Sequence, residues 1–354
     1  MRPAPANHRT LSECLLLAAG LMLAANVAPA QLAISQITTS YSSVNGYDTY
    51  NGSTFDRDIS SVTTFKDSAG NIYDANTVAG TAYVRRNTTA GNANNSSVWY
   101  AQDPDGSRDF ASSYATTYSS LLLGNNILRG SDNTFANGSG DVAAGNVERL
   151  DFLFSSSGIT STIATSFAIF DRGLAGQHDN VKIAVITGWD SVNQRPTAYG
   201  GNLVSITTAS YGATNPIGNF DYNLFRYDNG DNFGSPYWDN NSETGTQGIG
   251  GVTISMSDLG ITTGTKIYGY SLMGYDVTTG GNMANLVDWS DATYYKTDTT
   301  GETGTGGIDL SAVNGVLYNR RVPEPSTYGV VFIGATALAL GVRRRFRRIT
   351  ARAA

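Results

Sequence analysis

Apolar and polar residues alternate over many short stretches of this chain, and long helical patterns are scarce. The clearest alternating stretches lie at 150–154, 181–186 and 252–256. A period of two places one face of a strand on a core and the other face toward solvent or a second sheet. The pattern therefore predicts an all-β fold, with further strands at 59–65, 81–86, 98–101, 167–170, 222–227, 267–272 and 316–318.

Turn-forming residues separate the expected strands, as at 228–231 (DNGD) and 278–281 (TTGG). Gly, Ser, Thr, Asn and Tyr are abundant, which suits short strands joined by tight turns. One short helix is expected over 114–123, ended by Gly124. We find no internal repeat, which disfavours a solenoid. Many short strands at this spacing predict an antiparallel, jelly-roll-like β-sandwich.

The N-terminal 30 residues have the layout of a secretory signal peptide. Arg2 and Arg9 precede an apolar run over 14–25, and small residues occupy Ala28 and Ala30. This order predicts a signal helix that signal peptidase removes after Ala30, following export by the Sec machinery. The apolar run is shorter than the roughly 20 residues that a permanent membrane span needs.

A second uncharged run lies near the C-terminus, over 328–342, and predicts a transmembrane helix. Its fifteen residues reach only about 22 Å at about 1.5 Å per residue, short of a ~30 Å hydrocarbon core. Flanking side chains must therefore snorkel, or the bilayer must thin. A basic tail follows and is expected to stay cytoplasmic by the positive-inside rule, through Arg343, Arg344, Arg345, Arg347 and Arg348.

Pro323, Glu324 and Pro325 immediately precede this apolar run. The triplet, the short apolar helix and the arginine cluster together resemble the PEP-CTERM sorting signal. The resemblance implies that an exosortase, a membrane-embedded transpeptidase of Gram-negative bacteria, cuts the tail near the triplet. The anchored inner-membrane precursor would then pass to the cell surface or the extracellular matrix. Weaker resemblance to the bodies of such cargo proteins lies at 129–138 (RGSDNTFANG), 147–154 (VERLDFLF) and 286–293 (LVDWSDAT).

Three segments follow from this reading: 1–30, 31–322 and 323–354. The body, 31–322, has a possible weak subdivision near 128, because 31–128 is the more polar part. Removing both ends lowers the count of Lys and Arg from 23 to 15 and that of Asp and Glu from 29 to 27. The body is therefore clearly acidic, which disfavours nucleic acid as a partner.

Few residues of the body suit catalysis. Cys14 is the only cysteine and leaves with the signal peptide, so the body forms no disulfide. His178 is the only histidine of the body, which disfavours a zinc site or a serine–histidine triad. We expect it to be exposed in its Gly-rich turn. A glycosidase needs two carboxyl groups at a defined separation, and the sequence indicates no such pair.

Two segments carry candidate binding chemistry. In 221–243, aromatic side chains could stack on the sugar rings of a polysaccharide or pack on the sandwich edge, namely Tyr227, Phe233, Tyr237 and Trp238. In 103–109, the carboxylates of Asp103, Asp105 and Asp109 could bind Ca²⁺ or form a solvated turn, because the EF-hand spacing is not met. No other cofactor is expected.

The sequence thus favours a non-enzymatic surface or matrix protein that acts by packing, adhesion or glycan contact. A secreted carbohydrate-active enzyme with the same anchor is the alternative, and an unprocessed tail-anchored protein is a third. Sparse glutamates and a single histidine favour the first hypothesis. The tail alone names no activity.

Overall fold

The computed structural model describes residues 31–42, 47–50, 53–56, 59–86, 96–101, 108–109, 118–136, 147–227, 238–239, 244–296 and 307–322. The expected signal peptide, the Pro323–Glu324–Pro325 triplet, the expected transmembrane helix and the arginine tail lie outside these ranges. Within them, no helix is long and apolar enough to cross a membrane.

Six antiparallel strands close into a barrel. The first strand, β1, pairs with β4 along one edge and with β18 along the other, so the sheet has no break. Such closure leaves no free edge along the paired part of these strands. In ring order they are β1 (Leu32–Ser42), β4 (Ile59–Asp67), β5 (Ile72–Val78), β21 (Val316–Arg320), β12 (Thr165–Gly173) and β18 (Thr244–Ser255).

Aromatic and aliphatic side chains fill the barrel. The Phe65 ring stacks on Tyr73 at 4.7 Å between centroids and meets the Tyr318 ring edge-on at 4.8 Å. Alternate residues of β12 face opposite sides, so Ala168 and Phe170 belong to this interior while their neighbours belong to the core outside it. The barrel is thus a packed core rather than a ligand cavity.

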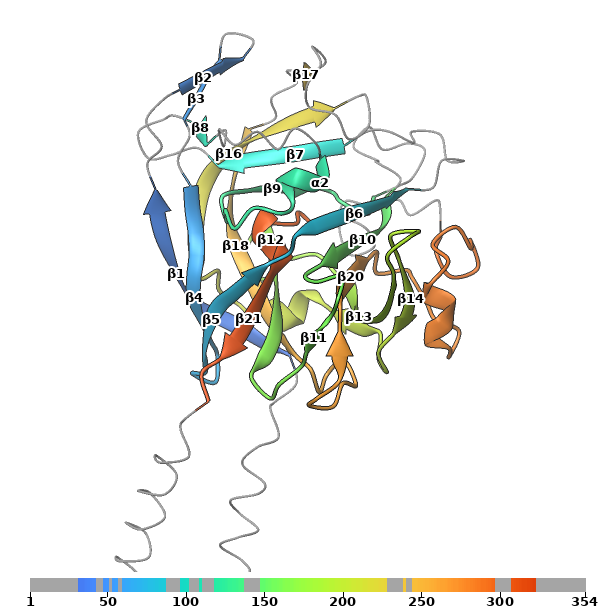
Figure 1. The fold of residues 1–354 in the computed structure, drawn as a ribbon. Coiled ribbons are helices and arrows are strands. Elements are labelled where there is room, and N and C mark those ends of the chain that lie inside the picture. The colour runs from blue at the N-terminus through green and yellow to red at the C-terminus, as the bar shows by residue number, and fades with distance from the viewer. Residues whose placement is uncertain are drawn as a thin grey trace, which may run out of the picture.

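The large sheet continues past the barrel through three strands, β16 (Ile217–Tyr227), β7 (Ser96–Ala101) and β9 (Arg129–Asp132), with β17 (Trp238–Asp239) beside β16. Trp99 and Leu224 of this extension join the barrel core. The extension therefore covers the barrel interior at the end where β7 and β16 cross it (Figure 1).

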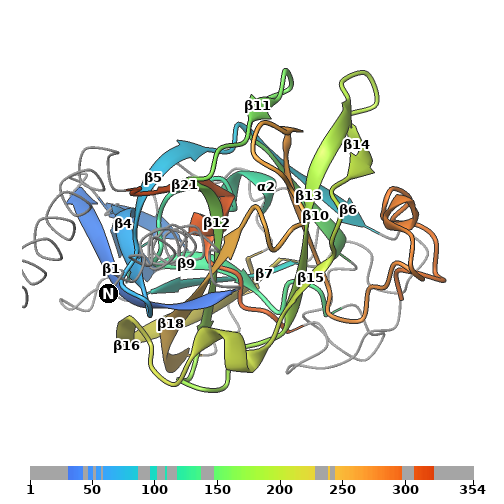
Figure 2. The ribbon, with the colours of Figure 1, turned by 90° about the horizontal axis from the view of Figure 1, so that it is seen from below.

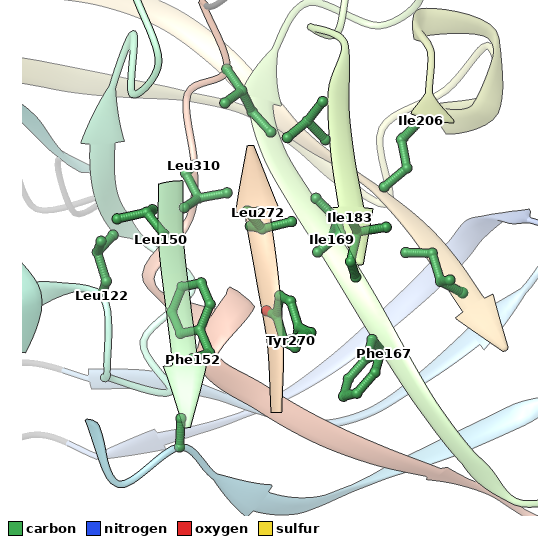
Figure 3. Packing of buried hydrophobic residues seen from close by; sticks show 14 of the residues in the cluster. Leu122, Leu150, Phe152, Phe167, Ile169, Ile183, Ile206, Tyr270, Leu272 and Leu310 are labelled. Atoms are coloured by element: carbon green, nitrogen blue, oxygen red, sulfur yellow. The ribbon is translucent and has the colours of Figure 1, made fainter. Parts of the chain in front are cut away.

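A second sheet packs on the outside of the barrel (Figure 2). Its core meets the outward residues of β12 and β18, as Phe167 and Ile169 lie opposite Phe152, Tyr270 and their neighbours (Figure 3). Its strands are β14 (Arg195–Tyr199), β13 (Val181–Asp190), β20 (Gly269–Met273), β10 (Val147–Leu153), β6 (Thr81–Arg86) and β15 (Val204–Ile206).

The outer face of the second sheet is also buried. The segment 274–296 lies over it and contributes Val277, Leu286 and Tyr295 to a third cluster. The remaining elements are short: β2 (Tyr47–Tyr50), β3 (Ser53–Asp56), β8 (Arg108–Asp109), β11 (Ile159–Thr160), β19 (Lys266–Ile267), α2 (Tyr118–Leu121), η1 (Thr208–Tyr211), η2 (Met283–Leu286) and η3 (Ala312–Gly315).

The antiparallel ring fixes where the ends of the body lie. Going round the ring, β1, β5 and β12 run one way and β4, β21 and β18 the other. The start of β1 and the end of β21 therefore share one end of the barrel, which we call the exit pole. The opposite end, the far pole, holds β2, β3, β8 and β17 (Figure 1).

The predicted all-β, antiparallel architecture is confirmed. Strand β6 matches the expected stretch 81–86, and β4 extends the stretch 59–65 by two residues. The helix expected over 114–123 is described only as the single turn Tyr118–Leu121. Closure of a barrel was not predicted, because it depends on a pairing between the first and eighteenth strands that no local pattern encodes. The barrel takes strands from both sides of residue 128: β1, β4 and β5 come before it, and β21, β12 and β18 come after it.

Candidate functional site

The predicted aromatic surface falls partly within the described residues. Tyr227 ends β16, and Trp238 lies directly opposite it across the β16–β17 pair, with Arg226 opposite Asp239. Phe233 and Tyr237 lie outside the described residues. The backbone thus brings two of the four predicted aromatic positions together at the far pole, in the β16–β17 hairpin.

The predicted calcium ligands cannot be assembled from what is described. Asp109 lies in β8, paired with Asp56 of β3, whereas Asp103 and Asp105 lie outside the described residues. Over the described part of the chain, no three His, Cys, Asp or Glu residues gather in a way that could hold a metal ion.

The structure reveals instead a buried charged cluster around Arg172, at the far end of β12. Nη2 of Arg172 donates to Oδ1 of Asp132 at 2.6 Å and to Oδ2 of Asp309 at 2.5 Å. Arg172 Cζ lies 3.6 Å from the Tyr222 ring centroid and 5.2 Å from that of Trp99. The Arg172 cluster therefore joins the barrel to all three strands of the extension.

Burial and the neighbouring charges shift the pKa values of Arg172 and Asp309. Burial disfavours the charge of Arg172, but the carboxylates of Asp309 and Asp132 outweigh this effect and raise its pKa. Burial also raises the pKa of Asp309 well above its usual value, against the lowering effect of Arg172. Because Nε and Nη1 of Arg172 have no hydrogen-bond partner, the two flanking rings supply its remaining contacts.

His178 is buried, so its expected exposure was wrong: only 2% of it is accessible. Its ring Nδ1 lies 3.1 Å from Oδ2 of Asp171, and Nε2 lies 2.6 Å from Oδ1 of Asn215. Gly250 makes room for the ring, since a Cβ there would lie 2.3 Å from Nε2. Gly173, in the Gly-rich turn itself, also packs against the ring, since a Cβ there would lie 2.9 Å from Nδ1.

The hydrogen bonds of the two ring nitrogens bear on the protonation of His178. Nδ2 of Asn215 donates to the carbonyl of Gly173 at 2.8 Å, which turns Oδ1 toward the ring as an acceptor. Both ring nitrogens thus face acceptor oxygens, an arrangement that favours the protonated imidazolium. Burial alone would lower the pKa of His178, but the hydrogen bond and charge of Asp171 prevail and raise it.

A second buried ion cluster lies between the second sheet and segment 274–296. Asp151 accepts from Nε of Arg149 at 2.7 Å, from Nε of Arg85 at 2.8 Å and from Oγ of Ser271 at 2.6 Å. Arg149 also donates to the carbonyl of Leu286 at 2.5 Å. The cluster ties the covering segment to the sheet.

These clusters draw on three stretches that the sequence analysis singled out, 129–138, 147–154 and 286–293. The first stretch supplies Asp132, and the second supplies Arg149 and Asp151. The third supplies Leu286 and Trp289, whose ring centroid lies 5.2 Å from Cζ of Arg149. The signal that could have found the clusters is a charged residue inside an otherwise apolar strand. Their carboxylates are all occupied by protein donors, so the geometry is that of a structural clamp rather than an open catalytic site.

One shallow depression of about 400 Å³ lies beside the start of β1, lined by Gln31, Asn202, Asp258, Thr279 and Met283 among others. Asp258 caps its own turn by accepting from the backbone and hydroxyl of Ser255. The depression therefore brings no pair of reactive groups together.

Comparisons of the chain with protein-family models, with curated proteins and with solved structures each gave no match.

The Arg172 cluster predicts a large loss of stability when its cation is removed. Arg172→Met leaves two buried carboxylates without a counter-ion, which costs about 3–5 kcal/mol of unfolding free energy. Arg321→Met is the matched control, because that residue forms an exposed ion pair with Asp74. Urea unfolding of the purified protein measures both. Equal, small losses would contradict the structural role of the cluster.

The raised pKa of His178 predicts a pH-dependent stability. The folded state binds the proton more tightly than the unfolded state, so this stabilisation is complete below the unfolded pKa of about 6.5 and is lost as the pH rises through the folded pKa. The pKa of Asp309 is also raised, so Asp309 adds a pH dependence of the same sign. Comparing wild type with His178→Gln isolates the contribution of His178. The variant should be less stable at low pH and lose less stability on raising the pH. Parallel pH profiles of the unfolding free energy would refute the assignment.

Proposed function

We propose that this chain is an exported bacterial surface or extracellular-matrix protein that an exosortase sorts through its C-terminal tail. The precursor is anchored in the inner membrane by the apolar run 328–342, and the tail is cut near Pro323–Glu324–Pro325. Signal peptidase and the Sec machinery act first, at the other end. The proposal rests on the sequence pattern of the two ends.

The position of the chain ends in the fold adds structural support to this proposal. The body begins and ends at the exit pole, because β1 starts there and β21 finishes there. A folded body can therefore hang from one membrane by either end without crossing its own surface. The far pole, with the β16–β17 hairpin, then points away from the membrane, as display of a binding surface requires.

The start of the folded body also fits the proposed processing. The side chain of Gln31 donates to the carbonyl of Ser205 at 3.0 Å and accepts from Ser210 at 3.1 Å. The next two residues pair with β18. Cleavage after Ala30 would thus remove the leader while sparing the strand that closes the barrel.

A non-enzymatic role fits the buried charged side chains, because protein groups occupy them. The Asp171–His178 pair and the carboxylates of Asp132, Asp151 and Asp309 bind protein groups. The apolar core shared by the barrel and the second sheet suits the sandwich-like body expected of a stable matrix component. Packing, adhesion or glycan contact is then the role of its surface.

Processing by an exosortase is tested in a Gram-negative host with and without that enzyme. With the enzyme, the mature chain should begin at Gln31, end near Pro323 and leave the inner membrane. Without it, the chain should keep its arginine tail and stay in the inner membrane. Intact mass and membrane fractionation measure both properties. A tail retained in both hosts would make 328–342 an ordinary anchor.

Our second proposal is that the β16–β17 hairpin binds a polysaccharide. The observation behind it is the register that places Tyr227 opposite Trp238. Paired aromatic positions in a hairpin can offer faces on which sugar rings stack. Trp238→Ala should abolish glycan-array binding, whereas Trp189→Ala, in β13 of the other sheet, should retain it. Equal binding by both variants would exclude the hairpin, and cleavage of the glycan by wild type would favour the enzyme alternative.

A further inference from the structure

The exit pole carries exposed aliphatic side chains beside the departing chain. Ile163 is 55% accessible, Val322 40% and Ile72 38%. They are neighbours, because the backbone NH of Arg321 donates to the carbonyl of Ile72 and that of Arg320 donates to the carbonyl of Ala164, each at 2.8 Å. Three exposed aliphatic residues thus come from three adjacent strand ends around the exit of the chain.

Basic side chains surround these residues, although the body as a whole is acidic. Lys66, on β4, and Arg321 are exposed, and Arg320 is half-buried at the end of β21. Arg321 forms an exposed ion pair with Asp74 at 2.7 Å. Cationic and aliphatic groups together suit the interface of an anionic bilayer, where apolar side chains enter and basic ones meet the headgroups.

The turn that carries Ile72 is rigidly built. Asp67 accepts from the backbone NH groups of Ala69 and Asn71, both at 2.9 Å, and from the hydroxyl of Tyr73 at 3.0 Å. Since Tyr73 belongs to the barrel core, the turn is fixed to the barrel. The surface at this pole is therefore formed before any membrane contact.

The length of the tail restricts how far this pole can move from the membrane. Five residues, 323–327, separate Val322 from the apolar run that begins at Tyr328. Fully extended, they span at most about 18 Å. The short apolar run also draws its flanking residues toward the bilayer, because it is shorter than the hydrocarbon core.

From these observations, we infer that the exit pole rests on the bilayer surface while the tail is attached, with Ile72, Ile163 and Val322 in the interfacial layer and Lys66, Arg320 and Arg321 on anionic headgroups. This inference rests on the proposed anchoring of 328–342. It means that the anchored precursor is held upright, with its tail segment at the depth of the membrane-embedded enzyme and its far pole in the aqueous phase.

The test uses single-cysteine variants of the tail-bearing chain, purified from a host that lacks the exosortase. Cys14 leaves with the signal peptide, so one introduced cysteine gives one labelling site. Ile72→Cys and Ile163→Cys report on the exit pole. Val78→Cys and Leu174→Cys are matched controls, because those residues are 42% and 41% accessible and lie at the opposite ends of the same strands, β5 and β12.

Each variant carries a polarity-sensitive fluorophore and is reconstituted into phosphatidylcholine vesicles with or without phosphatidylglycerol. Labels at 72 and 163 should shift to the blue and be quenched by nitroxide lipids, more strongly with phosphatidylglycerol, while labels at 78 and 174 should do neither. Lys66→Glu with Arg320→Glu should weaken the quenching at 163. If the chain binds vesicles but none of the four labels shifts to the blue or is quenched, the inference is overturned and the anchor stands. Chain that fails to sediment with vesicles would overturn the anchor and the inference together.

Discussion

The pairing of β1 with β18 is the contact on which the rest of the structure depends. Two residue pairs, Leu32 with Thr253 and Ala33 with Val252, join the start of the described chain to a strand more than 200 residues later. They close the ring, enclose the Phe65–Tyr73–Tyr318 interior and turn Val252 and Ile254 outward to build the core shared with the second sheet. They also place both ends of the body at one pole.

Closure leaves one physical problem, the covering of the barrel interior at the far pole, and the Arg172 cluster addresses it. A guanidinium held by Asp132 and Asp309 and flanked by Trp99 and Tyr222 joins β12 to the extension. A buried ion cluster is weak evidence of added stability, since apolar side chains can often do as well. Its directional bonds instead specify how β7, β9 and β16 lie across the barrel.

The sequence predicted what depends on local pattern and missed what depends on distant contact. Alternation located β6 and most of β4, because one face of each is apolar. It could not predict the barrel, since no local feature of Leu32 or Thr253 encodes their pairing. His178 was misjudged because glycines around it suggested a solvated turn, whereas Gly250 provides the space in which the ring is buried. The pairing of Tyr227 with Trp238 was expected only as proximity within one segment.

Disulfide trapping of the β1–β18 contact tests the central claim most directly. In a chain that begins at Gln31, and so lacks the single native cysteine Cys14, Ala33→Cys with Val252→Cys places two thiols on directly paired residues, within the Cα separation that a disulfide accepts. The account predicts rapid, complete crosslinking on mild oxidation without loss of folded structure, while Ala33→Cys with Val78→Cys stays reduced. Failure of the first pair to crosslink in folded protein would show that the barrel is open and would remove the common exit pole.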